Sequence, residues 1–314
     1  MTPASTPATQ TAIVETHALT KTFGRASALD GLDLTVAEGE VHGFLGPNGA
    51  GKSTTIRILL GLMRATSGRA RVFGLDPWAE PLTTHRDIAY VPGDVSLWPG
   101  LTGGEAIDLL TSLRGGADPA RRERLINEFE FDPRKKARTY SKGNRQKVAL
   151  IAAFARPARL YILDEPSSGL DPVMESVFSR QVERARSEGA TVLLSSHILS
   201  EVERLCDRVT IIRSGVAVES GTLTELRHLS RTTFRVAGVA ATVLANLAGV
   251  HDLRDAGSAI SDAVEFEADA DAIPAVLSAL SAHTVDSLTV EPASLESLFL
   301  RHYSSATDTA QVAR

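Results

Sequence analysis

Residues 41–55, VHGFLGPNGAGKSTT, constrain the fold more than any other stretch of this chain. A short apolar run leads into a glycine-rich loop, Gly46 to Ser53, that matches the pattern G-x-x-x-x-G-K-[ST] of a phosphate-binding loop (P-loop). Its glycines allow backbone N–H groups to turn toward phosphate oxygens, and the N-terminus of the following helix attracts the same anion. The stretch therefore predicts a strand, a loop and a helix that bind a nucleoside triphosphate.

The side chains of this loop fit the same chemistry. Lys52 supplies a cation for the β- and γ-phosphates, and Ser53 supplies a hydroxyl ligand for Mg²⁺. The alternative is a glycine turn that matches the pattern by chance, but the apolar strand before it and the helical IRILLGL after it weigh against that. The predicted nucleotide-binding residues of the loop are Gly46, Pro47, Asn48, Gly49, Ala50, Gly51, Lys52, Ser53, Thr54 and Thr55.

Composition sets limits on the partners and on the architecture. The 314 residues suit two domains, or one large and one small, and a hydrophobic content of 43% is ample for buried cores. A formal net charge of −5 gives no general attraction to nucleic acid or anionic lipid, so a basic partner surface would have to be local. The lone Cys206, in the apolar helical context EVERLCDRV, is predicted to be a core thiol.

Neither the N-terminus nor any apolar run predicts membrane insertion. Residues 1–12, MTPASTPATQTA, have no basic and no apolar signal region, and they are expected to form a flexible tail. The longest apolar run, Val148 to Ala155, is far shorter than the roughly 20 residues that cross a bilayer. We therefore expect a soluble chain whose membrane role depends on a partner.

Residues 13–222 follow the pattern of an α/β domain. Residues 13–45 alternate between strand-like runs and turns, which predicts an antiparallel sheet beside the P-loop strand. Two charged helical stretches between Leu101 and Thr139 predict a helical subdomain at about 95–160, inserted into an α/β core. The core resumes with strands at LYILDEP, TVLLSSH and RVTIIRSG.

Residues 223–303 have a different character and predict an accessory α+β domain. Strand-like and helical stretches follow in the order β-α-β-β-α-β, which suggests a ferredoxin-like fold, and the helix SLESLFLRHY comes after it. A packing or dimerisation role is favoured over ligand sensing because the segment carries no catalytic group of residues. Residues 304–314 are expected to form a second flexible tail.

A P-loop needs an acidic Mg²⁺ partner at the end of a buried strand. Asp164 follows four apolar residues in LYILDEP, so its carboxylate should lie at the strand end where the P-loop opens. Glu165 would then polarise the attacking water. His197, which follows the strand TVLLSS, could reach the γ-phosphate, although a lone histidine at a strand end is more often structural.

The stretch YSKGNRQKVAL resembles the signature motif of ATP-binding cassette (ABC) proteins. The resemblance covers about residues 13–221 and includes Phe23 for base stacking, the P-loop, Asp164 with Glu165, the Ser168–Asp171 loop and His197. It implies two nucleotide-binding domains that face each other head to tail, with each ATP between one P-loop and the opposite signature helix. With one such domain in the chain, a homodimer is the simplest assembly. The residues that the resemblance adds to the nucleotide site are Phe23, Ser141, Gly143, Asn144 and Asp171.

Three positions depart from the usual pattern of that family. Lys142 and Asn144 replace a glycine and a glutamine of the signature. Gly93 stands where a glutamine generally contacts Mg²⁺ and relays the state of the site to a membrane partner, and the adjacent Asp94 is a candidate substitute. Phe23 replaces the more frequent tyrosine, a small change because stacking needs only the ring face.

Three functions fit these motifs. The C-terminal region resembles the ATPases of bacterial drug and antibiotic exporters, which implies a cytoplasmic ATPase on the inner face of the membrane with a separate transmembrane permease subunit. Import is the alternative direction of transport. Trp98, in the segment 94–101, either contacts the permease or packs within the helical subdomain. A soluble protein that acts on nucleic acid or ribosomes is disfavoured by scarce aromatics and a single cassette, and no nucleic acid partner is expected. Its basic cluster comprises Arg134, Lys135, Lys136, Arg138, Lys142, Arg145 and Lys147.

Overall fold

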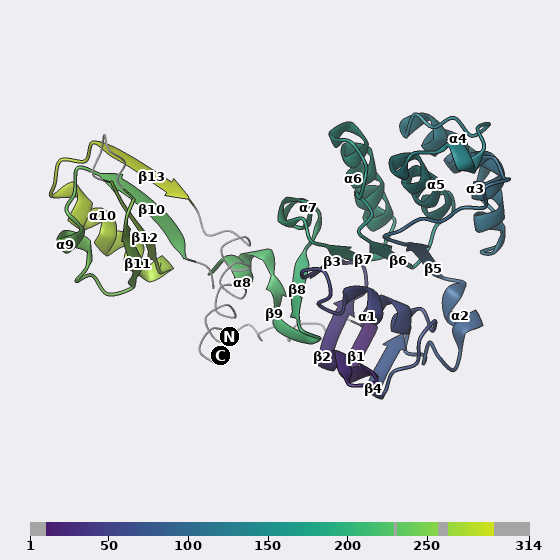
Figure 1. Ribbon diagram of the computed structural model, residues 1–314, viewed down its shortest axis with the longest axis horizontal. Coiled ribbons are helices and arrows are strands. Elements are labelled where there is room, and N and C mark those ends of the chain that lie inside the picture. Colours follow the sequence, from purple (N-terminus) through teal and green to yellow (C-terminus); the bar gives the residue numbers. More distant parts are fainter. Residues whose placement is uncertain (1–10, 229–230, 257–262, 292–314) are drawn as a thin grey trace, which may run out of the picture. The chain divides into compact units, whose positions relative to one another are not determined.

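The computed structural model describes residues 11–228, 231–256 and 263–291. The chain forms two compact units, Met1–Ser220 and Gly221–Arg314. Figure 1 labels the helices and strands of both units.

A six-stranded sheet is the centre of the first unit. Its order is β5-β6-β7-β3-β8-β9, and the strands from β5 to β8 pair in parallel. Strands covered on both faces are built from continuous apolar runs, and every residue of VHGFL in β3 and LYILD in β6 is buried. The strands are β3 (Val41–Leu45), β5 (Ile88–Val91), β6 (Leu160–Asp164), β7 (Thr191–Ser196), β8 (Arg208–Arg213) and β9 (Val216–Thr222).

The order of this sheet places three loops side by side. Strands β6, β7 and β3 are neighbours and run in parallel, so their carboxyl ends lie at the same edge. The P-loop follows β3, Glu165 follows β6 and His197 follows β7. Residues far apart in the sequence therefore share one edge of the sheet.

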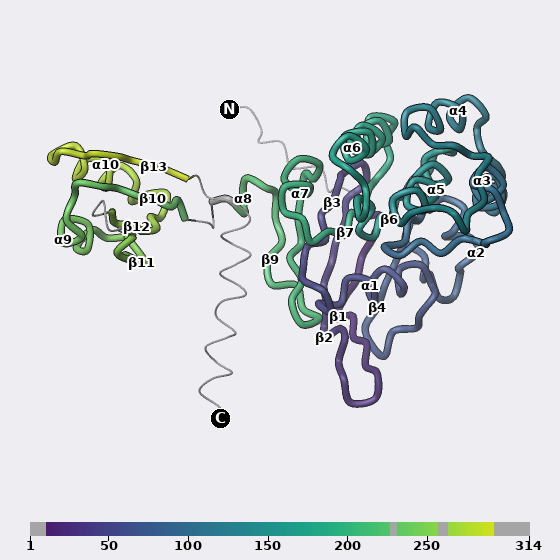
Figure 2. Tube along the Cα trace, turned by 45° about the horizontal axis from the view of Figure 1, so that its top comes forward, coloured from purple at the N-terminus to yellow at the C-terminus, as the bar shows by residue number. Residues whose placement is uncertain are grey.

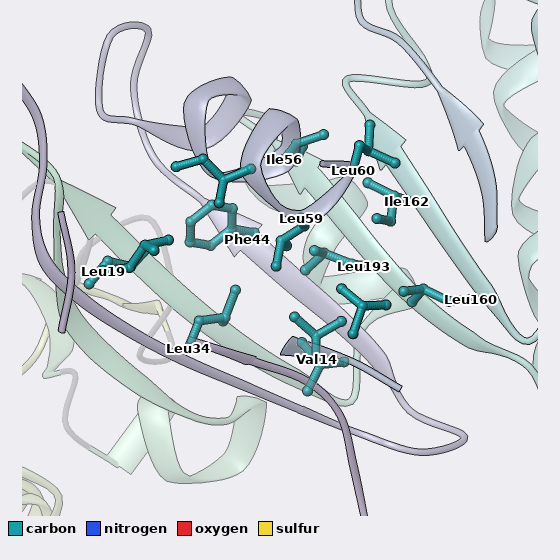
Figure 3. Close-up of a cluster of buried hydrophobic side chains, with 14 of the residues drawn as sticks. Val14, Leu19, Leu34, Phe44, Ile56, Leu59, Leu60, Leu160, Ile162 and Leu193 are labelled. Atoms are coloured by element: carbon teal, nitrogen blue, oxygen red, sulfur yellow. The ribbon is translucent and has the colours of Figure 1, made fainter. Parts of the chain in front are cut away.

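One hydrophobic cluster joins the central sheet to the P-loop helix α1 (Lys52–Leu59) and to a second sheet (Figure 3). Phe44 of β3 and Leu193 of β7 meet Ile56 and Leu59 of α1, all of them fully buried. Burying a side chain of this size contributes about 1.5–3 kcal/mol at most. The helix that follows the P-loop is thus fixed by its own apolar face. Two further helices follow β6 and β7, namely α6 (Pro172–Ser187) and α7 (Leu199–Leu205).

The second sheet is antiparallel, with the order β2-β1-β4. It contains the predicted strands β1 (Ala12–Phe23), β2 (Ala26–Ala37) and β4 (Ser67–Val72). Gly24, with φ +60°, lies in the two-residue turn between β1 and β2, and Figure 2 shows this hairpin extending from the first unit. The predicted antiparallel subdomain is confirmed.

The predicted helical subdomain is also confirmed. Helices α3 (Gly103–Ser112) and α4 (Pro119–Glu128) both pack against α5 (Lys142–Phe154). Side-chain caps define their starts, because Asp118 accepts hydrogen bonds from the first backbone N–H groups of α4, and Thr102 forms a capping box with Glu105 at α3. Two short elements were not predicted from the sequence, namely α2 (Pro81–His85) and the 3₁₀ helix η1 (Ala137–Thr139).

The second unit has the predicted ferredoxin-like fold. After the unpredicted helix α8 (Leu223–His228), its strands form a sheet of order β11-β12-β10-β13 in which all neighbours are antiparallel. Phe234 and Phe266 stack at its core with ring centroids 5.2 Å apart. The elements are β10 (Thr232–Ala237), α9 (Ala241–Leu244), β11 (Val250–Asp255), β12 (Ala263–Ala268), η2 (Ala270–Ala272), α10 (Ile273–Ser281) and β13 (Ser287–Glu291).

Some predictions fall outside the described residues. These are the helix at 294–303, the tail at 304–314 and nearly all of the tail at 1–12. Within the described ranges, no helix combines the length and the apolar character that crossing a membrane requires.

Candidate functional site

The P-loop connects β3 to α1, and two of its glycines are required by close contacts. A Cβ atom at Gly46 would lie 2.5 Å from the carbonyl oxygen of Ile212. Gly51 has φ +115°, and a Cβ there would lie 2.8 Å from the carbonyl oxygen of Ala28. The glycine pattern therefore lets the loop pack closely against neighbouring backbone as well as turn.

Lys52 is buried at the base of the loop. Its Nζ donates hydrogen bonds to the carbonyl oxygens of Gly46 at 2.5 Å and Pro47 at 3.1 Å, and it lies 3.9 Å from Glu165 Oε1. Burial lowers the pKa of Lys52, while the carboxylates of Glu165 and Asp164 oppose that shift. The cation is thus held between the loop and the acidic pair.

A hollow of about 140 Å³ opens beside this amine. Its walls are backbone and small polar side chains of the P-loop, together with the Glu165 side chain, which suits phosphate better than an apolar ligand. The residues that line it are Ala28, Pro47, Asn48, Gly49, Gly51, Lys52, Ser53, Thr54 and Glu165.

Asp164 and Glu165 lie where β6 ends, as the sequence predicts. Asp164 is buried and accepts a short hydrogen bond from the Ser195 hydroxyl of β7. Glu165 has a left-handed backbone with φ +46°, a strained conformation that costs about 1–3 kcal/mol, and its N–H donates to the Ser195 carbonyl oxygen at 3.0 Å. The strain turns the Glu165 side chain toward the mouth of the P-loop.

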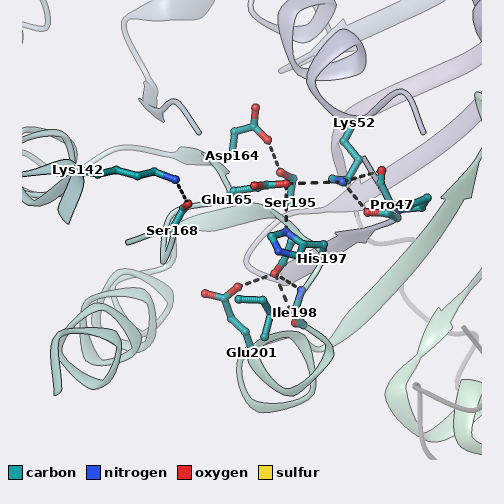
Figure 4. A network of polar contacts seen from close by, with 12 residues as sticks. Pro47, Lys52, Lys142, Asp164, Glu165, Ser168, Ser195, His197, Ile198 and Glu201 are labelled. Carbon is teal, nitrogen blue, oxygen red and sulfur yellow. Dashed lines mark hydrogen bonds and ion pairs between the residues drawn. The ribbon is translucent and has the colours of Figure 1, made fainter. Parts of the chain in front are cut away.

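His197 completes a line of three side chains across this edge of the sheet (Figure 4). Its Nδ1 lies 3.2 Å from Glu165 Oε1, the same oxygen that faces Lys52 Nζ. About half of the His197 side chain is exposed to solvent. The structure therefore brings together the three predicted catalytic residues, which come from three separate segments of the chain.

The donor set fits Mg²⁺ that is held jointly by protein and phosphate. Ser53 offers an exposed hydroxyl in the hollow, and Asp164 offers a carboxylate at the adjacent strand end. No group of three or more His, Cys, Asp or Glu side chains that could hold a metal occurs in the described part of the chain. A cation that keeps water and phosphate oxygens as its other ligands needs no such cage.

Several predicted binding residues do not line the hollow. Thr55 is buried in α1, where its hydroxyl donates to the Gly51 carbonyl oxygen, and Ala50 belongs to the hydrophobic core. Gly46 forms the turn without facing the hollow. Phe23, at the end of β1, is half-exposed, and the Lys21 ammonium lies 5.1 Å from its ring centroid.

The signature residues form a second cluster at the start of α5. Ser141 caps this helix and accepts a hydrogen bond from the Asn144 N–H at 3.3 Å. A Cβ at Gly143 would lie 2.4 Å from the Gly169 carbonyl oxygen, so the signature packs directly on the loop at 168–171. None of these residues lines the hollow of their own P-loop.

Lys142 ties the same two segments together by a contact that the sequence did not predict. Its Nζ donates to the Ser168 hydroxyl at 2.6 Å. At the other end of that loop, Asp171 caps α6 by accepting from the N–H groups of Val173 and Met174. Asp171 therefore has a structural role in its own chain beside the predicted one.

Gly93 lies against the acidic pair. A Cβ at this position would lie 3.3 Å from the Asp164 carbonyl oxygen and 3.7 Å from the Glu165 Cβ. The side chain of Asp94 is exposed to solvent. The position that departs from the usual pattern thus lies directly beside Asp164 and Glu165, although it has no side chain.

Sequence reasoning missed the polar residues behind the site. Ser195 binds Asp164, Ser196 binds the buried Glu201, and both serines end β7. The sequence signal that could have identified them is the pair of serine hydroxyls, Ser195 and Ser196, at the end of an otherwise apolar strand.

A separate apolar cleft of about 390 Å³ lies beside the helical subdomain. Trp98 is close to it in sequence and is 49% exposed, so it does not pack fully within the helices. The cleft is lined by Leu60, Leu62, His85, Ile88, Tyr90, Pro92, Val95, Ser96, Leu97, Leu110, Leu113, Arg114, Ala149, Ala152 and Ala153.

Comparisons with known proteins agree with the geometry. Residues 29–168 match the family described as ABC transporter. The chain is 41% identical over 222 residues to the daunorubicin/doxorubicin resistance ATP-binding protein DrrA of Streptomyces peucetius, which covers 69% of this chain and 67% of the relative. It is 30% identical over 302 residues to the linearmycin resistance ATP-binding protein LnrL of Bacillus subtilis (strain 168), covering 92% and 97%. A solved structure of an ATP-binding subunit of an ABC transporter superposes with a TM-score of 0.64 at 34% identity, covering 69% and 92%.

Proposed function

The chain belongs to the ABC transporter family and is an ATPase of this type, and we propose that it powers a separate membrane-spanning exporter. The observation that carries the enzymatic part is the line of Lys52, Glu165 and His197 across the mouth of the P-loop. Each of the three side chains can be given one task.

Lys52 binds the phosphates. Its Nζ now donates to two loop carbonyl oxygens, and phosphate oxygens offer stronger, charged acceptors at the same place. Mg²⁺, held by Ser53, Asp164 and phosphate oxygens, would neutralise charge on the phosphates.

Glu165 orients the attacking water and accepts its proton. Its carboxylate lies at the mouth of the hollow and is partly exposed, so a water molecule can reach it. His197 holds that carboxylate through the 3.2 Å contact and presents its other ring nitrogen, Nε2, to the transferring phosphoryl group. The two residues thus work as a pair.

We propose that the working form is a homodimer. The Ser141 hydroxyl and the N-terminus of the thirteen-residue helix α5 form an anion-binding surface, yet they do not line the hollow of their own P-loop. A second copy arranged head to tail would bring them to the γ-phosphate.

The apolar cleft supports a membrane-embedded partner. It lies between the end of α1, strand β5 and helices α3 and α5, and several large apolar side chains near it in the sequence are exposed. Exposed apolar surface of this kind marks an interaction site. The exposed residues are Leu62, Leu82, Trp98, Leu109 and Leu113. Such a partner would place the chain on the inner face of the cell membrane.

The relatives suggest the class of cargo. Two of them are named for resistance to daunorubicin/doxorubicin and to linearmycin. We propose that the exporter moves drugs, antibiotics or other hydrophobic small molecules. The proposed domains are the cassette at 13–222 and an accessory domain at 223–303.

The test is reconstitution of export. The chain is expressed together with a candidate permease subunit in a drug-sensitive host, and daunorubicin accumulation in the cells is measured. The wild type should lower accumulation, and Lys52→Ala should not. The exporter proposal is wrong if the chain does not bind the permease subunit. It is also wrong if ATP hydrolysis raises daunorubicin accumulation, a result that would indicate import.

A further inference from the structure

We propose that Glu201 is a positioning residue that holds the loops of Glu165 and His197 together from behind the nucleotide site. The proposal rests on the proposed ATPase mechanism. It assigns a task to a buried carboxyl group that lies outside the P-loop, the acidic pair and the signature.

Glu201 lies in α7 and is only 4% exposed. Its Oε2 accepts a hydrogen bond from the Ser196 hydroxyl at 2.7 Å (Figure 4). The same hydroxyl oxygen accepts from the backbone N–H of Ile198 at 2.9 Å. The Ser196 hydroxyl therefore links the residues on both sides of His197, and Glu201 fixes that hydroxyl.

On its other side Glu201 faces the loop that carries Glu165. The buried hydroxyl of Ser167 faces the Glu201 carboxyl group and acts to lower its pKa. Ser167 belongs to a tight turn in which the Ser168 N–H donates to the Glu165 carbonyl oxygen at 3.1 Å. One carboxyl group thus binds the His197 loop through Ser196 and faces the Glu165 loop at Ser167, while Glu165 and His197 meet at the front, 3.2 Å apart.

Stability alone does not explain this residue. Glu201 Oε1 is buried and is without a hydrogen-bond partner among the described residues. A buried carboxyl group with an unpaired oxygen destabilises a fold, and apolar residues of similar volume often replace such groups without loss. The position of Glu201 between two catalytic loops accounts for its presence.

Charged groups on two helices act on the Glu201 carboxyl group. Burial raises its pKa, the Ser196 and Ser167 hydroxyls oppose the shift, Glu175 of α6 raises the pKa further and Arg204 of α7 lowers it. The buried Cys206 thiol also lies within electrostatic reach, since Glu201 contributes to raising its pKa. Protonation of Glu201 would change which of its hydrogen bonds it donates and which it accepts.

The experiment compares Glu201→Ala and Glu201→Gln in the full chain bound to its membrane subunit. Glu201→Ala should lower kcat for ATP hydrolysis about tenfold or more, because loosely held catalytic groups lose their alignment. KM for ATP should stay within about twofold, since the P-loop is untouched. Glu201→Gln keeps the acceptor for Ser196 and should restore kcat to within about threefold of the wild type.

The pH dependence of kcat distinguishes a positioning role of Glu201 from a purely structural one. Gln cannot titrate, so the ratio of kcat in Glu201→Gln to kcat in the wild type should change as the pH rises above 4.5, the ordinary pKa of a glutamate. Glu183→Ala, at an exposed position on α6, is the matched control and should leave kcat unchanged.

Three results would overturn the proposal. These are an unchanged kcat in Glu201→Ala, a loss of kcat that equals the loss of folded protein, or a Gln variant as impaired as Ala. The proposed function is checked separately by Glu165→Gln, which must abolish hydrolysis in the same preparation. If Glu165→Gln hydrolyses ATP normally, the mechanism fails and not only the role of Glu201.

Discussion

Gly143 shows at the residue scale how closely the signature packs on the neighbouring loop. A Cβ at this position would lie 2.4 Å from the Gly169 carbonyl oxygen, a backbone atom that cannot move aside alone. Any side chain must therefore displace the start of α5 from the 168–171 loop.

Gly143→Ala should reduce ATP hydrolysis by at least about tenfold, because the displaced α5 N-terminus loses its alignment. Steady-state hydrolysis by purified protein measures the effect. Gly100→Ala is the control, since no atom lies within 4 Å of the added Cβ and the backbone there does not need glycine. Equal activity of the two variants would contradict the packing argument.

The raised pKa of Glu201 predicts how the stability of the folded chain changes with pH. Its pKa is raised above the ordinary value of 4.5 by burial, so the folded chain keeps a proton that the unfolded chain releases. The stability contributed by this proton is complete below about pH 4.5 and is lost as pH rises through the folded pKa. The Tm of Glu201→Gln relative to the wild type should therefore increase with pH above about 4.5. Thermal unfolding from about pH 4.5 to pH 8 tests this, and a constant difference would contradict it.

At the scale of single elements, α4 depends on a side-chain cap. Asp118 Oδ1 accepts hydrogen bonds from the N–H groups of Ala120 and Arg121 at 2.9 and 3.2 Å. Asp118→Ala should lower the free energy of unfolding by about 1 kcal/mol, a Tm decrease of about 2–4 °C for a unit of this size. Calorimetry measures it, and Asp118→Asn, which keeps an acceptor, should lose less. A normal Tm for the Ala variant would show that the cap is not needed.

Element prediction was reliable where a long pattern was present and failed where it was short. The strands and helices of the cassette core, and the order β-α-β-β-α-β of the second unit, follow from periodicity and from turn residues. Helices α2 and α8 have five and six residues, so no apolar period could be seen in them. Their existence depends on contacts made by the folded chain.

At the scale of the whole molecule, the proposed dimer predicts a trapped state. Glu165→Gln removes the proposed base but leaves Lys52 and the signature residues unchanged, so ATP should bind and stay. Light scattering should show a dimer with Mg²⁺ and ATP, and a monomer without nucleotide. A monomer under both conditions would contradict the head-to-tail assembly, and hydrolysis at the wild-type rate would show that Glu165 is not the base.

The membrane partner makes a second prediction at this scale. Trp98→Ala should reduce drug export while ATP hydrolysis continues, because it removes an exposed aromatic side chain from the proposed contact surface. Export and hydrolysis are measured in the same vesicles. Leu277→Ala on α10 is a control of similar exposure, 47% against 49%, on the other unit. Unchanged export in Trp98→Ala would remove this residue from the interface.

The sequence by itself determined the fold class and the position of the P-loop. A P-loop is local, because glycines, Lys52 and Ser53 are adjacent in the chain, and short-range sterics are enough to define it. Asp164, Glu165 and His197 could be predicted because each follows an apolar run, and parallel strands place their ends at one edge.

Only the tertiary structure decided which groups support that site. Glu201 meets Ser196 and faces Ser167, and Lys142 meets Ser168, through contacts between separate elements. The tertiary structure also places Gly93 against Asp164 and Glu165. It directs Thr55 and Ala50 toward the core instead of the hollow. Strand order and helix packing fix these contacts, and neither is encoded in the spacing of residues along the chain.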